Sequence, residues 1–79
     1  MVGGIEGTYT TVRDGGITYT YQAECGMQGG NWHWNAIVRC SDQLRGEPKG
    51  VIYDPPSFIE EPVLRGLVEL AIENRVGVE

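Results

Sequence analysis

His33 is the only histidine of the chain, and histidine is the side chain best suited to proton transfer near neutral pH. In the sheet register that the sequence favours, His33 lies across from Glu24, and this carboxylate could orient the imidazole for acid or base catalysis. A nucleophile is missing from the pair, because Cys25 belongs to the opposite face of its strand. We therefore interpret His33 and Glu24 as a cross-strand charge pair and predict that the protein is not an enzyme.

Metal and phosphate binding each require a spacing of residues that this chain lacks. Cys25, His33 and Cys40 are possible metal ligands, yet neither Cys-x-x-Cys nor His-x-x-x-His spacing occurs. The Gly-Met-Gln-Gly-Gly run at residues 26–30 is superficially similar to a phosphate-binding loop, which needs a helix N-terminus directly after its glycines. A strand follows the run here. The sequence therefore predicts a hairpin loop at residues 26–30, and neither a metal nor a cofactor.

The strand expected at residues 31–40 is the element that the rest of the chain is organised around. Its apolar positions alternate with polar ones, which predicts a pleated strand with one buried face. The apolar face carries Trp32, Trp34, Ala36, Val38 and Cys40, and the other face carries His33, Asn35 and Arg39, with only Ile37 out of step. Two indoles on one strand face supply a large buried area, so the core must assemble against them.

A hairpin is expected to precede this strand, because residues 17–25 alternate in the same way. Its turn is Asp14-Gly15-Gly16, which allows two registers. A two-residue loop places Tyr19 beside Thr10, whereas a three-residue loop with a glycine bulge places Tyr19 beside Thr11 and Cys25 beside Ile5. We prefer the second register, which gathers the tyrosines and isoleucines on one face.

The next hairpin, through residues 26–30, is expected to set Cys25 opposite Trp32 and Ala23 opposite Trp34, so that large residues meet small ones. The outer face of this hairpin is then polar and largely solvated. Mixed donors and acceptors on a rigid sheet suit contacts with a peptide or a small molecule. The candidate binding residues on this face are Gln22, Glu24, His33, Asn35 and Arg39.

The C-terminal part of the chain predicts one short strand and one helix. Residues 41–49 are expected to form a polar loop, residues 50–53 a fourth strand, and the prolines at 55 and 56 end the sheet. A short turn at 57–61 precedes a helix that starts at Pro62. The apolar face of the helix is expected to consist of Val63, Leu64, Leu67, Val68, Leu70 and Ala71, opposite Arg65, Glu69 and Glu73.

These elements predict one α+β domain over residues 1–79, a four-stranded antiparallel meander (ββββα) with the C-terminal helix packed on the aromatic face of the sheet. Four strands span roughly 19 Å, whereas one helix covers only about 10 Å. Aromatic surface from Tyr9, Tyr19, Tyr21, Trp32, Trp34 and Tyr53 would remain uncovered. A homodimer, formed on that surface or along an edge strand, is therefore expected. The competing explanation is that residues 1–4, 41–49 and 58–59 fold over the flank.

Charge is distributed unevenly over the 79 residues, whose formal net charge is −5. Residues 54–79 carry two arginines against six acidic side chains, a net charge of −4. Direct nucleic-acid binding is disfavoured, because Arg39, Arg45 and Lys49 are the only basic grouping. An acidic inhibitor or nucleic-acid mimic, acting through residues 54–79 with Glu69 and Glu73, is the alternative function.

The cysteines indicate a reducing compartment. In the expected meander Cys25 and Cys40 lie at opposite ends of a hairpin, roughly 25 Å apart, far beyond the ~7 Å limit for a disulfide. The N-terminus has neither the basic start nor the apolar run of a signal peptide, and no stretch approaches membrane-spanning length. We therefore expect a cytoplasmic protein without membrane contact. The favoured function is a small non-catalytic binding or regulatory module whose partner is an unidentified protein or small ligand.

Overall fold

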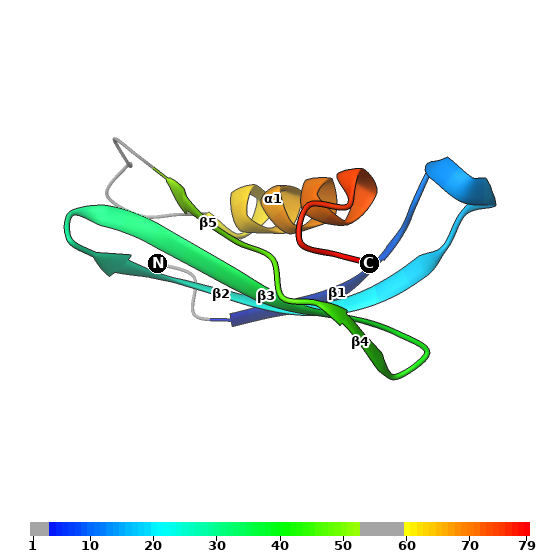
Figure 1. Cartoon of the computed structure of the whole chain (residues 1–79). Coiled ribbons are helices and arrows are strands. Elements are labelled where there is room, and N and C mark those ends of the chain that lie inside the picture. The colour runs from blue at the N-terminus through cyan, green and yellow to red at the C-terminus, as the bar shows by residue number, and fades with distance from the viewer. Residues whose placement is uncertain (1–3, 53–59) are drawn as a thin grey trace.

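Two long strands of alternating polar and apolar residues form the centre of an antiparallel sheet. In the computed structural model, which describes residues 4–52 and 60–79 apart from the Asp14 side chain, β2 spans Thr18–Gln28 and β3 spans Asn31–Cys40. Strand β1 (Gly4–Thr10) pairs with β2, while β4 (Gln43–Gly46) and β5 (Lys49–Ile52) both pair with β3. Helix α1 (Glu61–Asn74) lies along one face of this sheet (Figure 1). The predicted α+β meander with a C-terminal helix is confirmed.

The turn between β2 and β3 is shorter than the predicted loop. Gly29 and Gly30 have positive φ values of 57° and 84°, as the two central residues of a type I′ hairpin turn require. Strand β2 therefore continues to Gln28, and Cys25 lies opposite Trp34 rather than Trp32. The predicted register is wrong by two residues. A shift of two leaves every side chain on the predicted face, because the side-chain period of a strand is two.

The predicted register of the first hairpin is also wrong by two residues. Tyr19 lies opposite Tyr9, and Tyr21 lies opposite Gly7. The reason is Thr11, which is 4% exposed and closes a wider loop containing a 3-10 helix at Arg13–Gly15. Its hydroxyl accepts a hydrogen bond from Ile17 N at 2.9 Å and donates one to Arg13 O at 3.0 Å.

The predicted loop at residues 41–49 contains a strand. Ser41 and Asp42 form a tight turn with positive φ values of 52° and 64°, and β4 returns from it along β3. The ladder shifts by one residue between Val38 and Arg39 and then continues into β5, with Ala36 N donating to Pro48 O at 2.9 Å. Strands β4 and β5 thus act as one interrupted edge strand. Tyr53, the predicted end of this strand, lies outside the described residues.

Helix α1 begins at Glu61, one residue before the predicted start, with Pro62 in its first turn. The side chains of α1 that are buried are Leu64, Val68, Ala71 and Ile72. The predicted apolar face is wrong at Val63 and Leu70, which are 49% and 60% exposed, and it omitted Ile72, which is fully buried. The helix ends in a Schellman motif, in which Val76 N donates to Ala71 O and Arg75 N donates to Ile72 O.

The core lies between α1 and the apolar face of the sheet. Leu64, Val68 and Ile72 pack into one cluster with Tyr19, Tyr21, Trp32 and Trp34. These four aromatic residues are each less than 10% exposed, so the expectation that they remain uncovered in a single chain is wrong. The described part of the chain has no helix that is long and apolar enough to span a membrane.

The register also separates the two cysteines. Cys25 of β2 lies opposite Trp34 of β3. Cys40, which lies opposite Gln43 of β4, is six positions from Trp34 along β3. At ~3.3 Å per residue this separation is about 20 Å, too far for a disulfide. Both side chains are thiols, as predicted. Burial raises the pKa of the Cys25 thiol, which lowers its nucleophilicity at neutral pH.

Candidate functional site

The face of the sheet that points away from α1 is called the open face here. It carries alternate residues of β1, β2 and β3, and it includes all five predicted binding residues, Gln22, Glu24, His33, Asn35 and Arg39. The cross-strand neighbours differ from those predicted. Glu24 lies opposite Asn35, and His33 lies opposite Gly26. The predicted pairing of His33 with Glu24 is therefore wrong, which removes the geometric basis for a catalytic carboxylate–imidazole pair.

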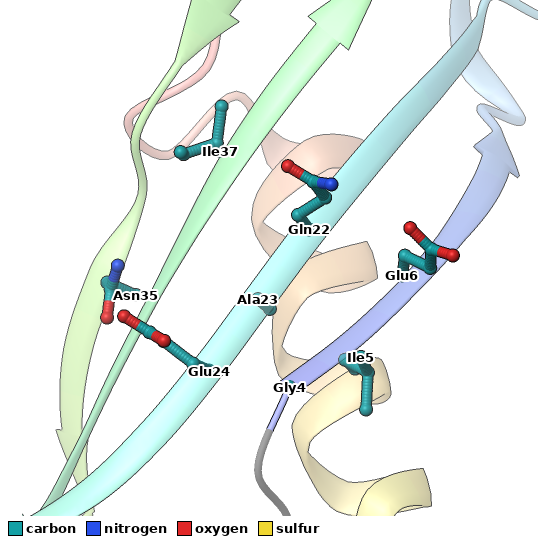
Figure 2. A pocket seen from close by; sticks show the side chains of 8 residues that line it. All are labelled: Gly4, Ile5, Glu6, Gln22, Ala23, Glu24, Asn35 and Ile37. Atoms are coloured by element: carbon teal, nitrogen blue, oxygen red, sulfur yellow. The ribbon is translucent and has the colours of Figure 1, made fainter.

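A shallow hollow of about 450 Å³ lies on the open face between β1 and β3. Figure 2 shows the side chains of Glu6, Gln22, Glu24 and Asn35 rising from three neighbouring strands, with α1 behind the sheet. Ile37 adds an apolar wall to the same hollow. Three predicted residues are thus brought together. Glu6 was missed, although the alternation of β1 with β2 places it beside Gln22.

Arg39 and His33 lie at opposite ends of the open face. Arg39 lines an adjacent depression of about 440 Å³ that shares Glu6, Gln22 and Ile37 with the first. His33 lines a third depression, of about 300 Å³, with Glu24 and Asn35. His33 and Arg39 lie six positions apart along β3, which at ~3.3 Å per residue is about 20 Å. The predicted residues therefore form an extended surface rather than one pocket.

The predicted binding residues do not hold the fold together. Within the part of the chain that the structure describes, the five side chains form neither hydrogen bonds nor ion pairs. Gln22, Glu24 and Asn35 are exposed, and His33 and Arg39 are half-buried. A partner could therefore engage them without breaking any contact inside the protein.

Glu73 on α1 has the opposite character, because it ties the helix to the loop after β1. Its carboxylate accepts hydrogen bonds from Val12 N at 2.7 Å, Tyr9 Oη at 2.7 Å and Arg13 N at 3.2 Å. These donors, the Val12 amide first among them, lower the pKa of Glu73 below its ordinary 4.5. The Arg13 guanidinium donates in turn to Glu73 O and to Ile72 O. These carbonyls lie near the C-terminal end of α1, where the helix dipole stabilises a positive charge.

Glu69 and Arg65 form a second contact between α1 and the sheet. Tyr21 Oη donates to Glu69 Oε2 at 2.8 Å and accepts from Arg65 Nη1 at 2.9 Å. Burial, followed by the hydrogen bond to Glu69, raises the pKa of Tyr21. Arg65 Nη2 also donates to Glu61 Oε1 at 3.2 Å. The prediction that Arg65, Glu69 and Glu73 lie opposite the apolar face of α1 is therefore wrong, since all three side chains bond to residues of the sheet.

The Glu73 contacts predict an acid-sensitive fold. Because folding lowers the pKa of Glu73, the unfolded chain binds more protons near the ordinary value of 4.5. The contribution of the ionised Glu73 carboxylate to the free energy of unfolding is complete above that value and is lost as pH falls through the lower folded-state pKa. Glu73→Gln is expected to destabilise the protein at pH 7 and to weaken the loss of stability that occurs as the pH falls below the ordinary value of 4.5. Denaturant unfolding at a series of pH values measures both effects.

Glu60→Gln is the matched control for this prediction, since Glu60 is exposed and forms no capping hydrogen bond through its side chain. The free energy of unfolding of Glu60→Gln should depend on pH as that of the original chain does. An unchanged profile in Glu73→Gln would show that the Val12, Tyr9 and Arg13 contacts do not stabilise the ionised carboxylate.

The open face carries amide, carboxylate, guanidinium and imidazole side chains, whereas the side chains of Cys25 and Cys40 belong to the opposite face. Among residues 4–52 and 60–79, apart from the Asp14 side chain, there is no group of three His, Cys, Asp or Glu side chains placed to hold a metal ion. Comparison with protein-family models, curated proteins and solved structures finds no match to this chain.

Proposed function

We propose that the protein is a small, non-catalytic binding or regulatory module that engages a partner protein through its open face. One observation carries this proposal. Gln22, Glu24 and Asn35 surround a hollow, yet none of them takes part in the contacts that hold the sheet and helix together. Side chains that are ordered by a rigid sheet and have unused hydrogen-bonding capacity are well suited to recognition.

The chemistry of the hollow favours a basic side chain of the partner. Glu6 and Glu24 supply two carboxylates, Gln22 and Asn35 supply amide acceptors, and Ile37 supplies an apolar wall. A lysine or arginine combines a charged head with an apolar stem, and so matches both parts of this lining. The formal net charge of −5 would also speed the approach of a basic partner.

The acidic alternative, in which residues 54–79 mimic a nucleic acid or inhibit a basic groove, has weaker support. Glu73 accepts three hydrogen bonds and Glu69 accepts one from Tyr21. Binding a basic groove through these two carboxylates would compete with contacts that join α1 to the sheet. We place the module in the cytoplasm, in keeping with two cysteines that remain thiols.

Affinity capture from a cytoplasmic extract tests the proposal, with mass spectrometry of the retained proteins at low and moderate salt. Glu24→Gln removes a charge from the hollow, and Glu60→Gln removes the same charge from the start of α1. We expect Glu60→Gln to retain a specific partner as the original chain does. Glu24→Gln should retain at least about tenfold less of that partner, as for the loss of a charged interface contact. Equal retention by both variants would refute the role of the hollow.

The acidic alternative predicts the reverse pattern in the same experiment. Retention would then fall steeply with salt and would suffer from Glu69→Gln while Glu24→Gln bound normally. Because Tyr21 contacts Glu69, the folding of Glu69→Gln must first be verified by circular dichroism.

A further inference from the structure

Within residues 4–52 and 60–79, the outer edge of β1 has backbone groups that no other strand pairs with. Thr11 N donates to Ile17 O at 2.9 Å, one step beyond the Thr10–Thr18 pair of the ladder. In an antiparallel strand, every second residue directs both its N–H and its C=O to the strand on one side, and the residues between direct theirs to the other side. Residues 5, 7 and 9 therefore bond to β2, and the outward-facing residues are Gly4, Glu6, Thr8 and Thr10. The bond from Arg65 Nη1 to Glu6 O, at 3.3 Å, agrees with this assignment.

The two edges of the sheet differ in how they are protected. At β4, Val78 forms a bridge with Gly46, and Glu79 N donates to Arg45 O at 2.8 Å. The C-terminal segment therefore covers part of that edge. Strand β1 is seven residues long and contains neither lysine nor proline, the residues that commonly prevent pairing at an edge strand. Among the described residues, only the Arg65 side chain bonds to its outward-facing backbone.

We propose that β1 pairs with β1 of a second copy of the chain, antiparallel and with Gly7 opposite Gly7 at the two-fold axis. In this register Gly4 lies opposite Thr10 of the second copy, and Glu6 lies opposite Thr8. Every outward-facing residue of β1 then enters a hydrogen-bonded pair. Glu6 O can accept from the second copy while keeping its bond to Arg65, because a carbonyl oxygen has two lone pairs.

Charge and shape both select this register over its neighbours. A register centred on Glu6 would set two carboxylates directly opposite each other, which is destabilising. A register centred on Thr8 would leave Gly4 without a partner. In the proposed register, Ile5 meets Tyr9 of the second copy on the core side of the sheet. Gly7 at the axis adds no side chain at a point where a Cβ atom would meet the Arg65 and Tyr21 side chains.

The dimer would join the open faces of two chains into one surface. Gly4 and Glu6 line the hollow at its β1 side, so the two hollows would lie beside the axis and face the same way. This part of the inference rests on the proposed function, whereas the interface itself does not. Self-association measured without any partner therefore separates a failure of the interface from a failure of the open-face proposal.

Charge substitutions at Thr8 test the interface and its register. Thr8 is exposed and lies next to Thr20 of β2, which is also exposed. Thr8→Lys would face Glu6 of the second copy and tighten the dimer, whereas Thr8→Glu would repel it. Two symmetric contacts change together, so we expect the dissociation constants of these variants to differ by about tenfold or more. Sedimentation equilibrium of the full chain at 0.15 M salt, where the screening length is about 8 Å, measures both constants.

Thr20→Lys and Thr20→Glu are the matched controls, because they change the net charge equally on the same face, one strand farther from the axis. Their dissociation constants should differ by less than about threefold. Thr8→Pro is a further variant: it removes an outward N–H without touching the ladder to β2, so it should stay folded and become monomeric. A monomeric original chain at high micromolar concentration would overturn the interface. A dimer that responds equally at positions 8 and 20, or that survives Thr8→Pro, would overturn it as well.

Discussion

Replacing Ile72 by alanine is expected to lower the free energy of unfolding by about 2–5 kcal/mol, the usual cost of truncating a fully buried aliphatic side chain. Ile72 is 0% exposed and packs in one cluster with Leu64, Val68 and the sheet aromatics. A chain of this length has a total stability of roughly 4–12 kcal/mol. The substitution should therefore remove a large share of the stability, which urea unfolding monitored by tryptophan fluorescence can measure.

Leu70→Ala is the control on the same helix. Leu70 is 60% exposed, so its truncation should change the free energy of unfolding by less than about 0.5 kcal/mol. The apolar face predicted from the sequence included Leu70 and omitted Ile72. A larger loss for Leu70→Ala than for Ile72→Ala would mean that α1 is rotated relative to the sheet.

Gly46→Ala is expected to detach the C-terminal segment from β4. A Cβ atom at this position would lie 2.0 Å from Gly77 O and 2.8 Å from Val78 Cα. Both are backbone atoms, so no side-chain rotation relieves the overlap. Val78, which is 5% exposed, would have to leave the core, at a cost of about 1.5–3 kcal/mol for a buried aliphatic side chain. Hydrogen exchange measures the detachment, because the Glu79 amide that bonds to Arg45 O should lose its protection.

Gly66→Ala is the comparison variant, which is expected to stabilise the protein rather than destabilise it. Gly66 lies within α1, and a Cβ atom there would meet no other atom within 4 Å. The substitution should raise the free energy of unfolding by roughly 0.5–1 kcal/mol, because alanine favours the helix more than glycine does. Equal protection of the Glu79 amide in Gly46→Ala and in the original chain would contradict the close packing of the C-terminal segment on β4.

The faces of the strands could be predicted from the sequence, but the registers could not. Alternation at residues 17–25 and 31–40 assigns every side chain to a face, and a register error of two residues leaves that assignment intact. The register depends on where each turn closes, and alternation does not indicate that position. Thr11 closes the first loop through its hydroxyl, and Ser41 and Asp42 adopt positive φ values without the glycine that normally signals such a turn.

The candidate site was predicted in part for the same reason. Gln22, Glu24 and Asn35 share a hollow because their face was right, and His33 lost its expected neighbour because the register was wrong. The roles of Glu69 and Glu73 could not be predicted, since their partners Tyr21 and Tyr9 lie more than forty residues away in the chain. Helical periodicity showed only that these carboxylates lie off the central apolar stripe.

The most direct test of the open-face proposal is an NMR titration of the isotope-labelled chain with the partner that affinity capture identifies. Gln22 and Asn35 carry side-chain amides within the hollow, and these amides report contact without any substitution. The proposal predicts that their signals and the backbone signals of residues 20–24 and 35–39 shift on binding, while those of Glu61–Asn74 change little. Shifts confined to Glu61–Asn74, with both side-chain amides unmoved, would contradict it.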